Sequence, residues 1–285
     1  MTASVLDLPT VVPAPETTVD RVRTWWRDVV VLTRRNLIHV SREPMQLSDV
    51  TIQPVLFTVL FIYVFGAAMS IPGGGSYKDF ALGGLLVMNL TTSSVGTAVG
   101  LSNDLVTGVI DRFRSLPMSR TTVLVGRAMS DLLAAVVCAF MVGVTGLLVG
   151  WRPTSSLLSV AAGFGVALLF GFAMAWINAC IGLRTTDSES AQAMAFLFIF
   201  PLAFVSSVFA PTQQMPSFVR FLANWNPVSA VAGATRTLFG NPNPQAAVPV
   251  WPCQHPVEAA LIWSVAILAV CIPLAARSFR ARTTD

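Results

Sequence analysis

Lysine is nearly absent from this chain of 285 residues, and its absence excludes one class of function. The single lysine, Lys78, stands between Tyr77 and Asp79. A P-loop requires Gly-Lys followed by Ser or Thr, so this chain cannot bind ATP through one. The metallopeptidase pattern HExxH and the hydrolase pattern GxSxG are missing as well. The sequence therefore predicts a protein that is not itself an enzyme and carries no cofactor of its own.

Histidine and cysteine are few and scattered. The two histidines, His39 and His255, are too far apart in sequence for a local metal motif. Three of the four cysteines lie in expected membrane helices, where a free cysteine behaves as a small hydrophobe. We therefore expect neither a metal site nor a disulfide framework. The cysteines are Cys138, Cys180, Cys253 and Cys271.

Charged residues are also scarce, at 11% of the chain against 54% hydrophobic residues. The hydrophobic residues gather in six runs, and about 20 apolar residues in a helix suffice to cross a bilayer. This pattern predicts an all-α integral membrane protein with six transmembrane helices. The expected spans are residues 50–70, 80–102, 128–150, 157–182, 190–210 and 257–276.

The basic residues are distributed unevenly between the two sides of the membrane. If the chain starts in the cytoplasm and crosses six times, 14 of its 18 Lys and Arg lie inside and 4 outside. The opposite orientation violates the positive-inside rule. Both termini are therefore expected in the cytoplasm, with residues 1–17 as a disordered tail. The net charge of +4 then reflects membrane orientation, and we expect no nucleic acid partner.

Residues 18–43 are expected to form an amphipathic helix at the inner membrane surface. Trp25 and Trp26 lie on its apolar face, whereas Arg34 and Arg35 lie on its basic face. A basic face combined with tryptophans suits a helix that lies among lipid headgroups. The alternative is an ordinary helix packed against the rest of the protein.

The second expected span is unusually polar, with Asn89, Thr92 and Ser93 near its middle. Such side chains are costly in lipid unless they face another helix or a cavity. They therefore bond to neighbouring helices or line a pathway, and the sequence leaves both interpretations open. Ionisable residues are nearly absent from the spans, so ion coupling through buried carboxylates has little support.

The longest inner loop, residues 103–120, contains an apolar stripe with helical spacing that Pro117 ends. The loop either connects two spans and does no more, or its short amphipathic helix docks on a cytoplasmic partner. Just after it, Arg127 and Asp131 are four residues apart and are expected to pair near the inner interface. The stripe consists of Val106, Val109, Ile110 and Phe113.

The external stretch 211–255 is apolar in a helical pattern without being long enough to span. Asn226 followed by Pro227 is a strong helix start, because Asn caps well and Pro fits the first helical position. Gly240 is a natural stop. We expect two short helices, about 216–225 and 227–239, that dip back toward the outer half of the membrane. Arg236 on the second helix is expected to face water, headgroups or a cavity.

Three segments carry a resemblance to a known family. They are Arg34-Arg35-Asn36-Leu37 through Arg42-Glu43-Pro44, the inner-loop run from Gly108 to Arg120, and the external run Pro216-Ser217-Phe218 through Asn226-Pro227-Val228-Ser229 with Arg236 and Gly240. Together with the order of elements, they resemble the type 2 ABC exporter permeases. Within that group, the chain is most similar to the daunorubicin/doxorubicin-resistance permease family. The resemblance covers about residues 18–282.

This resemblance implies a permease that pairs with a second permease, identical or homologous, and with two separate P-loop ATPase subunits. ATP and Mg²⁺ would bind to those ATPases. Residues 18–43 would be the connecting helix, 103–116 the coupling helix and 216–240 a re-entrant pair that closes the exit. The family often has an acid-rich Glu-x-Glu-x-Gly run before the inner-loop motif, and here only Asp104 precedes Gly108. The implied coupling residues are Val106, Val109, Ile110, Asp111, Arg112, Phe113, Arg114 and Pro117.

The function implied is export of a hydrophobic or amphipathic drug, lipid or glycolipid across a bacterial cytoplasmic membrane. A polysaccharide exporter subunit is the nearest alternative. A membrane-embedded enzyme would need clustered Asp, Glu or His, and a secondary transporter would need mid-membrane charges and internal repeats; the sequence shows neither pattern. The expected substrate path comprises Phe57, Phe61, Asn89, Thr92, Ser93, Phe196 and Phe200. The expected external gate comprises Phe218, Trp225, Asn226, Pro227 and Arg236.

Overall fold

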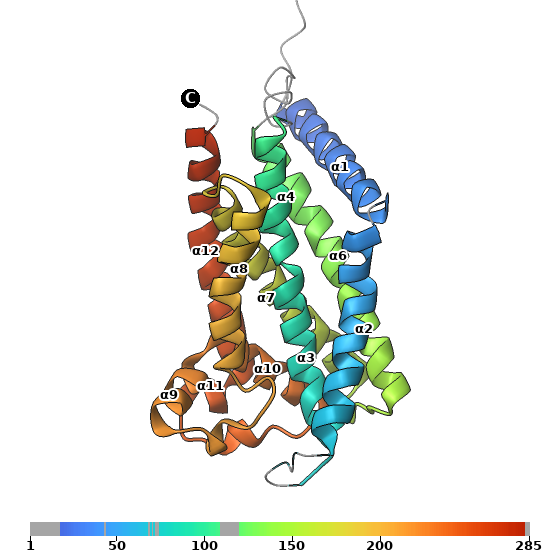
Figure 1. Cartoon of the computed structure of the whole chain (residues 1–285), viewed down its shortest axis with the longest axis vertical. Coiled ribbons are helices and arrows are strands. Elements are labelled where there is room, and N and C mark those ends of the chain that lie inside the picture. The colour runs from blue at the N-terminus through green and yellow to red at the C-terminus, as the bar shows by residue number, and fades with distance from the viewer. Residues whose placement is uncertain are drawn as a thin grey trace, which may run out of the picture.

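The computed structural model describes residues 18–42, 44–67, 69, 71, 74–108 and 120–282, and every regular element in these ranges is a helix (Figure 1). The expected tail, residues 1–17, and coupling residues 109–117 lie outside the described ranges. In chain order the elements are α1 (Thr18–Arg42), α2 (Pro44–Gly66), α3 (Tyr77–Ser93), α4 (Val95–Val106), α6 (Arg120–Val149), α7 (Leu157–Gly182), α8 (Ser188–Phe204), η1 (Thr212–Gln214), α9 (Ser217–Trp225), α10 (Pro227–Phe239), η2 (Pro244–Ala247), α11 (Trp251–Gln254) and α12 (Pro256–Arg282).

Among the described residues, five helical stretches are long and apolar enough to cross a membrane. They confirm five of the expected spans. The expected fifth span, residues 190–210, is helical only as α8, which has 17 residues. The qualifying stretches are Leu47–Gly66, Tyr77–Val106, Val125–Val149, Leu157–Gly182 and Pro256–Phe279.

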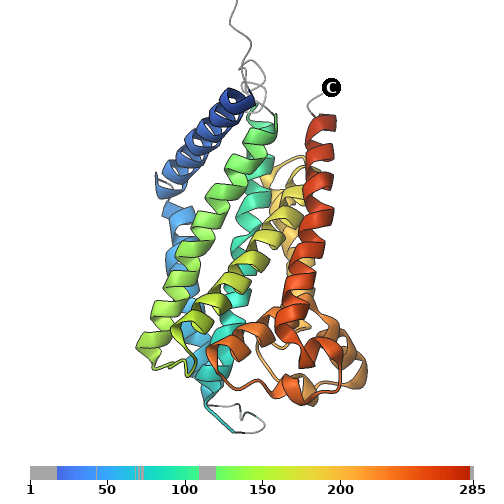
Figure 2. The same cartoon turned by 180° about the vertical axis from the view of Figure 1, so that it is seen from behind.

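The long helices form a bundle whose two ends differ. The start of α1 and the end of α12 lie at one end, and the short helices α9, α10 and α11 gather at the other (Figures 1 and 2).

The start of α8 is capped by Asp187, whose carboxylate accepts hydrogen bonds from the Ser190 N–H and hydroxyl, each at 2.7 Å. These bonds hold the pKa of the Asp187 carboxyl below its usual value.

Helix α1 packs along α6. Val29 and Leu32 are buried there, and the Thr33 hydroxyl donates to the carbonyl of Gly126 at 3.2 Å. Trp26, Arg34 and Arg35 are exposed. The helix therefore has a packed face as well as an exposed one, and its place at the membrane surface stays a prediction.

The core of the bundle is built around α3 and α10. Every residue of α3 from Phe80 to Thr91 is buried, and so is every residue of α10 from Val228 to Arg236. Small residues such as Gly83 and Gly233 allow close approach, because a Cβ at Gly83 would lie 2.9 Å from the Thr235 hydroxyl. Helix α10 is thus enclosed by α3, α7 and α12.

Candidate functional site

The expected second span is one apolar stretch, Tyr77–Val106, in which the helix is interrupted at the single residue Ser94, whose backbone stays in the right-handed helical region. Four polar side chains, at Ser94 and just before it, donate to carbonyls three or four residues earlier in the same helix, and such bonds from Ser and Thr often bend helices. The bonds run from Asn89 Nδ2 to Leu85 at 2.8 Å, Thr91 Oγ1 to Val87 at 2.7 Å, Thr92 Oγ1 to Met88 at 3.0 Å and Ser94 Oγ to Thr91 at 2.5 Å. The polar run therefore explains the break.

Helix α7 holds the broken segment from the side. Asn178 Nδ2 donates to Ser94 Oγ at 2.7 Å, inside the bundle. Nearer the C-terminal end of α7, where it passes α4, a Cβ at Gly182 would lie 2.5 Å from the carbonyl oxygen of Ala98. Only glycine allows the two backbones to approach this closely, so α4 is fixed to α7 along its length.

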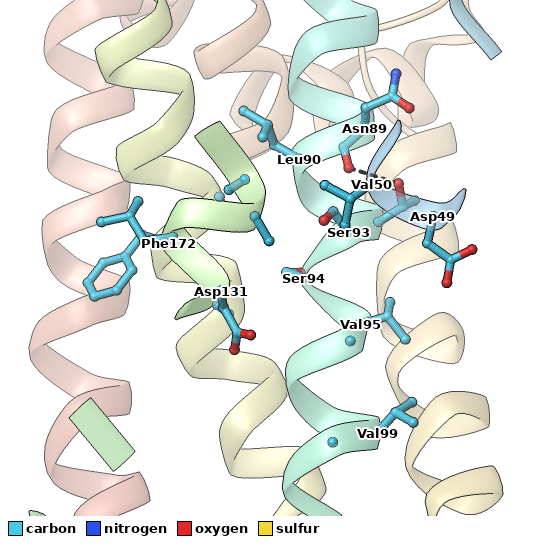
Figure 3. A pocket seen from close by; sticks show the side chains of 18 of the residues that line it. Asp49, Val50, Asn89, Leu90, Ser93, Ser94, Val95, Val99, Asp131 and Phe172 are labelled. Atoms are coloured by element: carbon cyan, nitrogen blue, oxygen red, sulfur yellow. Dashed lines mark hydrogen bonds between the residues drawn. The ribbon is translucent and has the colours of Figure 1, made fainter. Parts of the chain in front are cut away.

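A cavity of about 300 Å³ lies beside the break (Figure 3). Residues of α2, α3, α4, α6, α7 and α8 contribute to its walls. Its volume is at the small end of the range for small-molecule sites, and apolar walls with a few polar groups are typical of such sites. Its polar lining is Asp49, Gln53, Asn89, Thr92, Ser93, Ser94, Arg127, Asp131 and Gln192, and its larger apolar side chains include Val50, Leu90, Val99, Phe172 and Phe196.

Arg127 organises the charged wall of the cavity. Its Nε lies 3.3 Å from Asp131 Oδ1, which confirms the expected pair, and its Nη1 lies 4.0 Å from Asp104 Oδ2. Its Nη2 donates to the carbonyl of Gly96 at 2.8 Å, just past the helix break. A Cβ at Gly100 would collide with the guanidinium, so this position needs glycine for Arg127 to lie where it does.

The comparisons with known proteins place this arrangement in a family. Residues 27–239 match the ABC-2 type transporter family. The chain belongs to the ABC-2 type transporter family. It is 31% identical over 246 residues to "Daunorubicin resistance ABC transporter permease protein DrrB1" of Streptomyces coeruleorubidus, covering 86% of this chain and 83% of that protein. It is 24% identical over 285 residues to "Probable doxorubicin resistance ABC transporter permease protein DrrC" of Mycobacterium tuberculosis, covering 96% and 95% respectively.

These matches confirm the resemblance to the daunorubicin/doxorubicin-resistance permeases. They also place the chain among transporter permeases. The ABC-2 chain can therefore be described as a multi-pass membrane permease of the drug-resistance type.

Only some of the residues expected on the substrate path line the cavity of this ABC-2 permease. Asn89, Thr92, Ser93 and Phe196 line it. The other three do not: Phe57 and Phe200 are exposed on the bundle surface, and Phe61 stacks on Phe209 with ring centres 4.8 Å apart. Among the additional lining residues are Asp49, Gln53, Arg127, Asp131, Phe172 and Gln192.

The sequence contained one indication about two of these additional residues. The i,i+4 spacing of Arg127 and Asp131 predicted their pairing, although not their place in a cavity wall. Asp49, Phe172 and Gln192 stand on three different helices, and nothing in a single sequence places them together.

The end of the bundle opposite the start of α1 has the expected pair of short helices, α9 and α10. Asn226 caps α10, as expected, by accepting from the Val228 N–H at 2.8 Å, and Pro227 occupies the first helical position. Asn226 Nδ2 also donates to the carbonyls of Leu202 and Val205 at the end of α8. Phe218 and Trp225 are exposed on α9.

The expectation that Arg236 faces water, headgroups or a cavity is wrong. Its side chain is fully buried, and its guanidinium lies 3.7 Å from the ring centre of Phe80. Its Nε donates to the Phe80 carbonyl at 2.8 Å, and its Nη2 donates to the carbonyls of Ser207 at 2.8 Å and Val208 at 3.1 Å. The non-helical segment after α8 supplies the carbonyls of Ser207 and Val208, and α3 supplies that of Phe80, so backbone groups replace water around the charge.

The inner-loop residues are described only at their start. Val106 is exposed at the last position of α4, whereas Val109, Ile110, Asp111, Arg112, Phe113, Arg114 and Pro117 lie outside the described residues. Trp25 lies within α1. Their expected roles in connecting and coupling stay predictions.

Proposed function

We propose that this chain is the permease subunit of an ATP-driven ABC exporter in a bacterial cytoplasmic membrane. It would move a hydrophobic or amphipathic drug, lipid or glycolipid outward. The observation that carries the proposal is a cavity of about 300 Å³ at a broken membrane helix of an ABC-2 permease. Such a volume suits a small amphipathic molecule better than a polysaccharide chain.

The topology we propose has six spans and cytoplasmic termini. Helix α8 would be the remaining membrane helix, fifth in chain order, and would extend roughly 26 Å at 1.5 Å per residue, close to the thickness of the hydrocarbon core. An even number of crossings returns the chain to its starting side. The position of α1 and the end of α12 at one end of the bundle supports this topology, and so does the placement of basic residues.

We further propose that energy comes from partners. Two P-loop ATPase subunits would bind ATP and Mg²⁺, because this chain contains no P-loop. The coupling helix, residues 103–116, would lie in a groove of the ATPase, and α1 would be the connecting helix. Asp104, which lies 4.0 Å from Arg127, stands where the cavity wall meets this loop.

A second permease, identical or homologous, would complete the transporter. Exposed aromatic side chains on α2 and α8, including Phe57, Phe200 and Phe204, support an apolar surface for that partner or for membrane lipids. At the other end, α9 and α10 would form the external re-entrant gate. In this arrangement Arg236 holds α10 in place and does not itself contact the substrate.

Co-purification with the ATPase tests this function. The wild-type chain and a Phe113→Asp variant are extracted from membranes that contain the candidate ATPase. We expect the variant to lose most of the bound ATPase, because a charge in the apolar stripe opposes docking. Phe218→Asp is the matched control, since it places the same charge on the exposed face of α9 at the opposite end of the bundle.

The control should retain the ATPase at the wild-type level. Capture of no ATPase by the wild type, or equal capture by all three chains, would contradict the proposal. ATP-dependent uptake of a fluorescent amphipath into inside-out vesicles then reports the direction of transport.

A further inference from the structure

A second, much smaller cavity lies at the end of the bundle that holds the short helices (Figure 2). Residues of α9, α10, η2, α11 and the start of α12 form its walls. Its volume is about 10 Å³, close to the least space that holds one water molecule. A drug, a lipid headgroup or a sugar is too large for this cavity. Its polar lining consists of Asn224, Ser229, Asn243, Gln245 and Cys253.

Two side-chain atoms of this lining are buried without a hydrogen-bond partner among the described residues. One is a donor, Nε2 of Gln245, whose side chain is only 3% exposed, and the other is an acceptor, Oδ1 of Asn243. The other atom of the Asn243 amide has partners, because its Nδ2 donates to Thr237 Oγ1 at 3.2 Å and to the Gly233 carbonyl at 3.4 Å. Buried polar groups without partners are unfavourable, so this cavity favours a molecule that supplies both partners.

The chemistry of the lining restricts what that molecule is. Among the residues that line the cavity there is no Asp, Glu, Lys, Arg or His to balance the charge of an ion. A cation would meet the Gln245 donor, and an anion would meet the Asn243 acceptor. The ligand is therefore neutral, and it both accepts and donates a hydrogen bond. Water does both, and buried waters bridge such pairs of polar groups.

We propose that one water molecule is bound in this cavity and bridges Gln245 Nε2 and Asn243 Oδ1. The water accepts a hydrogen bond from the first atom and donates one to the second. Both residues belong to the proline-rich segment 241–256, which follows α10. The bound water lets this segment pack against α10 without leaving a buried amide unpaired. The inference goes beyond the proposed transport function and does not depend on it.

Radiolytic labelling tests the proposal, because a thiol lines the same cavity. X-ray pulses convert water to hydroxyl radicals, which oxidise a thiol that lies beside a bound water. Cys253 is buried in the cavity wall, whereas Cys138 is buried in the apolar core, outside the cavity. For the full chain in maltoside micelles, we expect mass spectrometry to show Cys253 oxidised several-fold faster than Cys138.

Two variants should abolish this difference by removing the water. Gln245→Met removes the donor at nearly constant volume, and Gly233→Ala adds a methyl group 4.0 Å from Asn243 Oδ1. In both variants the oxidation of Cys253 should slow to the rate of Cys138. Gln254→Met is the matched control, since it makes the same change at an exposed position of α11 outside the cavity. It should keep the wild-type rate.

The direction of a stability change is an independent measurement. Loss of the bridging water should lower the midpoint of thermal unfolding of Gln245→Met by about 3 °C, the shift for about one hydrogen bond in a chain of this length. Without a bound water, the same substitution would remove an unpaired buried donor and raise the midpoint. A raised midpoint would overturn the proposal, and so would equal oxidation of Cys253 and Cys138 in the wild type. Neither measurement involves ATP or an ATPase, so its outcome leaves the co-purification test unaffected.

Discussion

At the scale of single residues, Asn226 joins two helices. Its Oδ1 caps the start of α10, and its Nδ2 donates to the carbonyls of Leu202 and Val205, which the end of α8 leaves without helical partners. Helix ends inside a protein need such partners, because unpaired backbone groups are unfavourable when buried. One side chain therefore satisfies a helix start and a helix end together.

Asn226→Ala should lower the free energy of unfolding by about 3 kcal/mol, from a lost cap and unpaired buried carbonyls. Asn226→Asp keeps the cap acceptor but places a carboxylate against carbonyls, so it should also destabilise the fold. The midpoint of thermal unfolding in detergent, followed by tryptophan fluorescence, measures both. Asn103→Ala, on an exposed position of α4, is the control and should change little. A wild-type midpoint in both Asn226 variants would contradict this role.

Preferences of neighbouring residues in the sequence predict the structural roles of Asn226 and Pro227 but not that of Arg236. The cap at Asn226 and the first-turn Pro227 follow from preferences that act within a few residues. The burial of Arg236 was not predicted, because its partners are the backbone carbonyls of Phe80, Ser207 and Val208, which are distant in sequence. Side-chain polarity alone cannot show that backbone groups elsewhere are free to solvate a charge.

At the scale of elements, the break between α3 and α4 marks the limit of prediction from periodicity. Residues 80–102 have no proline, and their hydropathy is continuous, so one helix was expected. The break arises from the sum of several side-chain bonds to the helix backbone and from Asn178, a contact from α7. The polar run was visible in the sequence. Asn89 and Thr92 bond within their own helix and not to a neighbouring one, and with Ser93 they line the cavity. Their part in a transport path stays a prediction.

Gly100→Ala tests how α4 is held against α6. The added methyl group would displace the Arg127 guanidinium from Asp131 and Gly96, so we expect a loss of about 2 kcal/mol of stability. Gly96→Ala is the matched control one turn earlier, where the added Cβ meets no atom within 4 Å. It should leave the thermal midpoint unchanged or raise it slightly. Equal midpoints for the two variants would show that Arg127 does not need this space.

At the scale of the whole molecule, most helix bounds follow from the sequence. Hydropathy and caps are local properties, so α7 matches its expected limits, 157–182, and α10 matches 227–239. The cavity could be predicted only in part, because its walls come from six helices. Its α3 members stood out as polar, whereas nothing in the sequence indicated that Asp49, near the start of α2, lines the cavity.

Site-directed labelling tests the proposed topology. In a background without the native cysteines, Thr154→Cys and Thr186→Cys each place a thiol at an exposed turn position. With cytoplasmic termini and six spans, a membrane-impermeant maleimide should label position 154 in intact cells and position 186 only after lysis. The reverse pattern would invert the orientation, and labelling of both in intact cells would change the number of crossings.

The burial of Arg236 has a mechanical consequence for the end of the bundle that holds α9, α10 and α11. Its guanidinium ties α10 to the backbone of α3 and to residues 207 and 208, which follow directly from α8. Separating α10 from α3 would remove the hydrogen bond to Phe80, and separating it from residues 207 and 208 would remove the bonds to both carbonyls there, which leaves a buried cation short of partners. A shift of α10 is therefore expected to carry α3 and residues 207 and 208 with it.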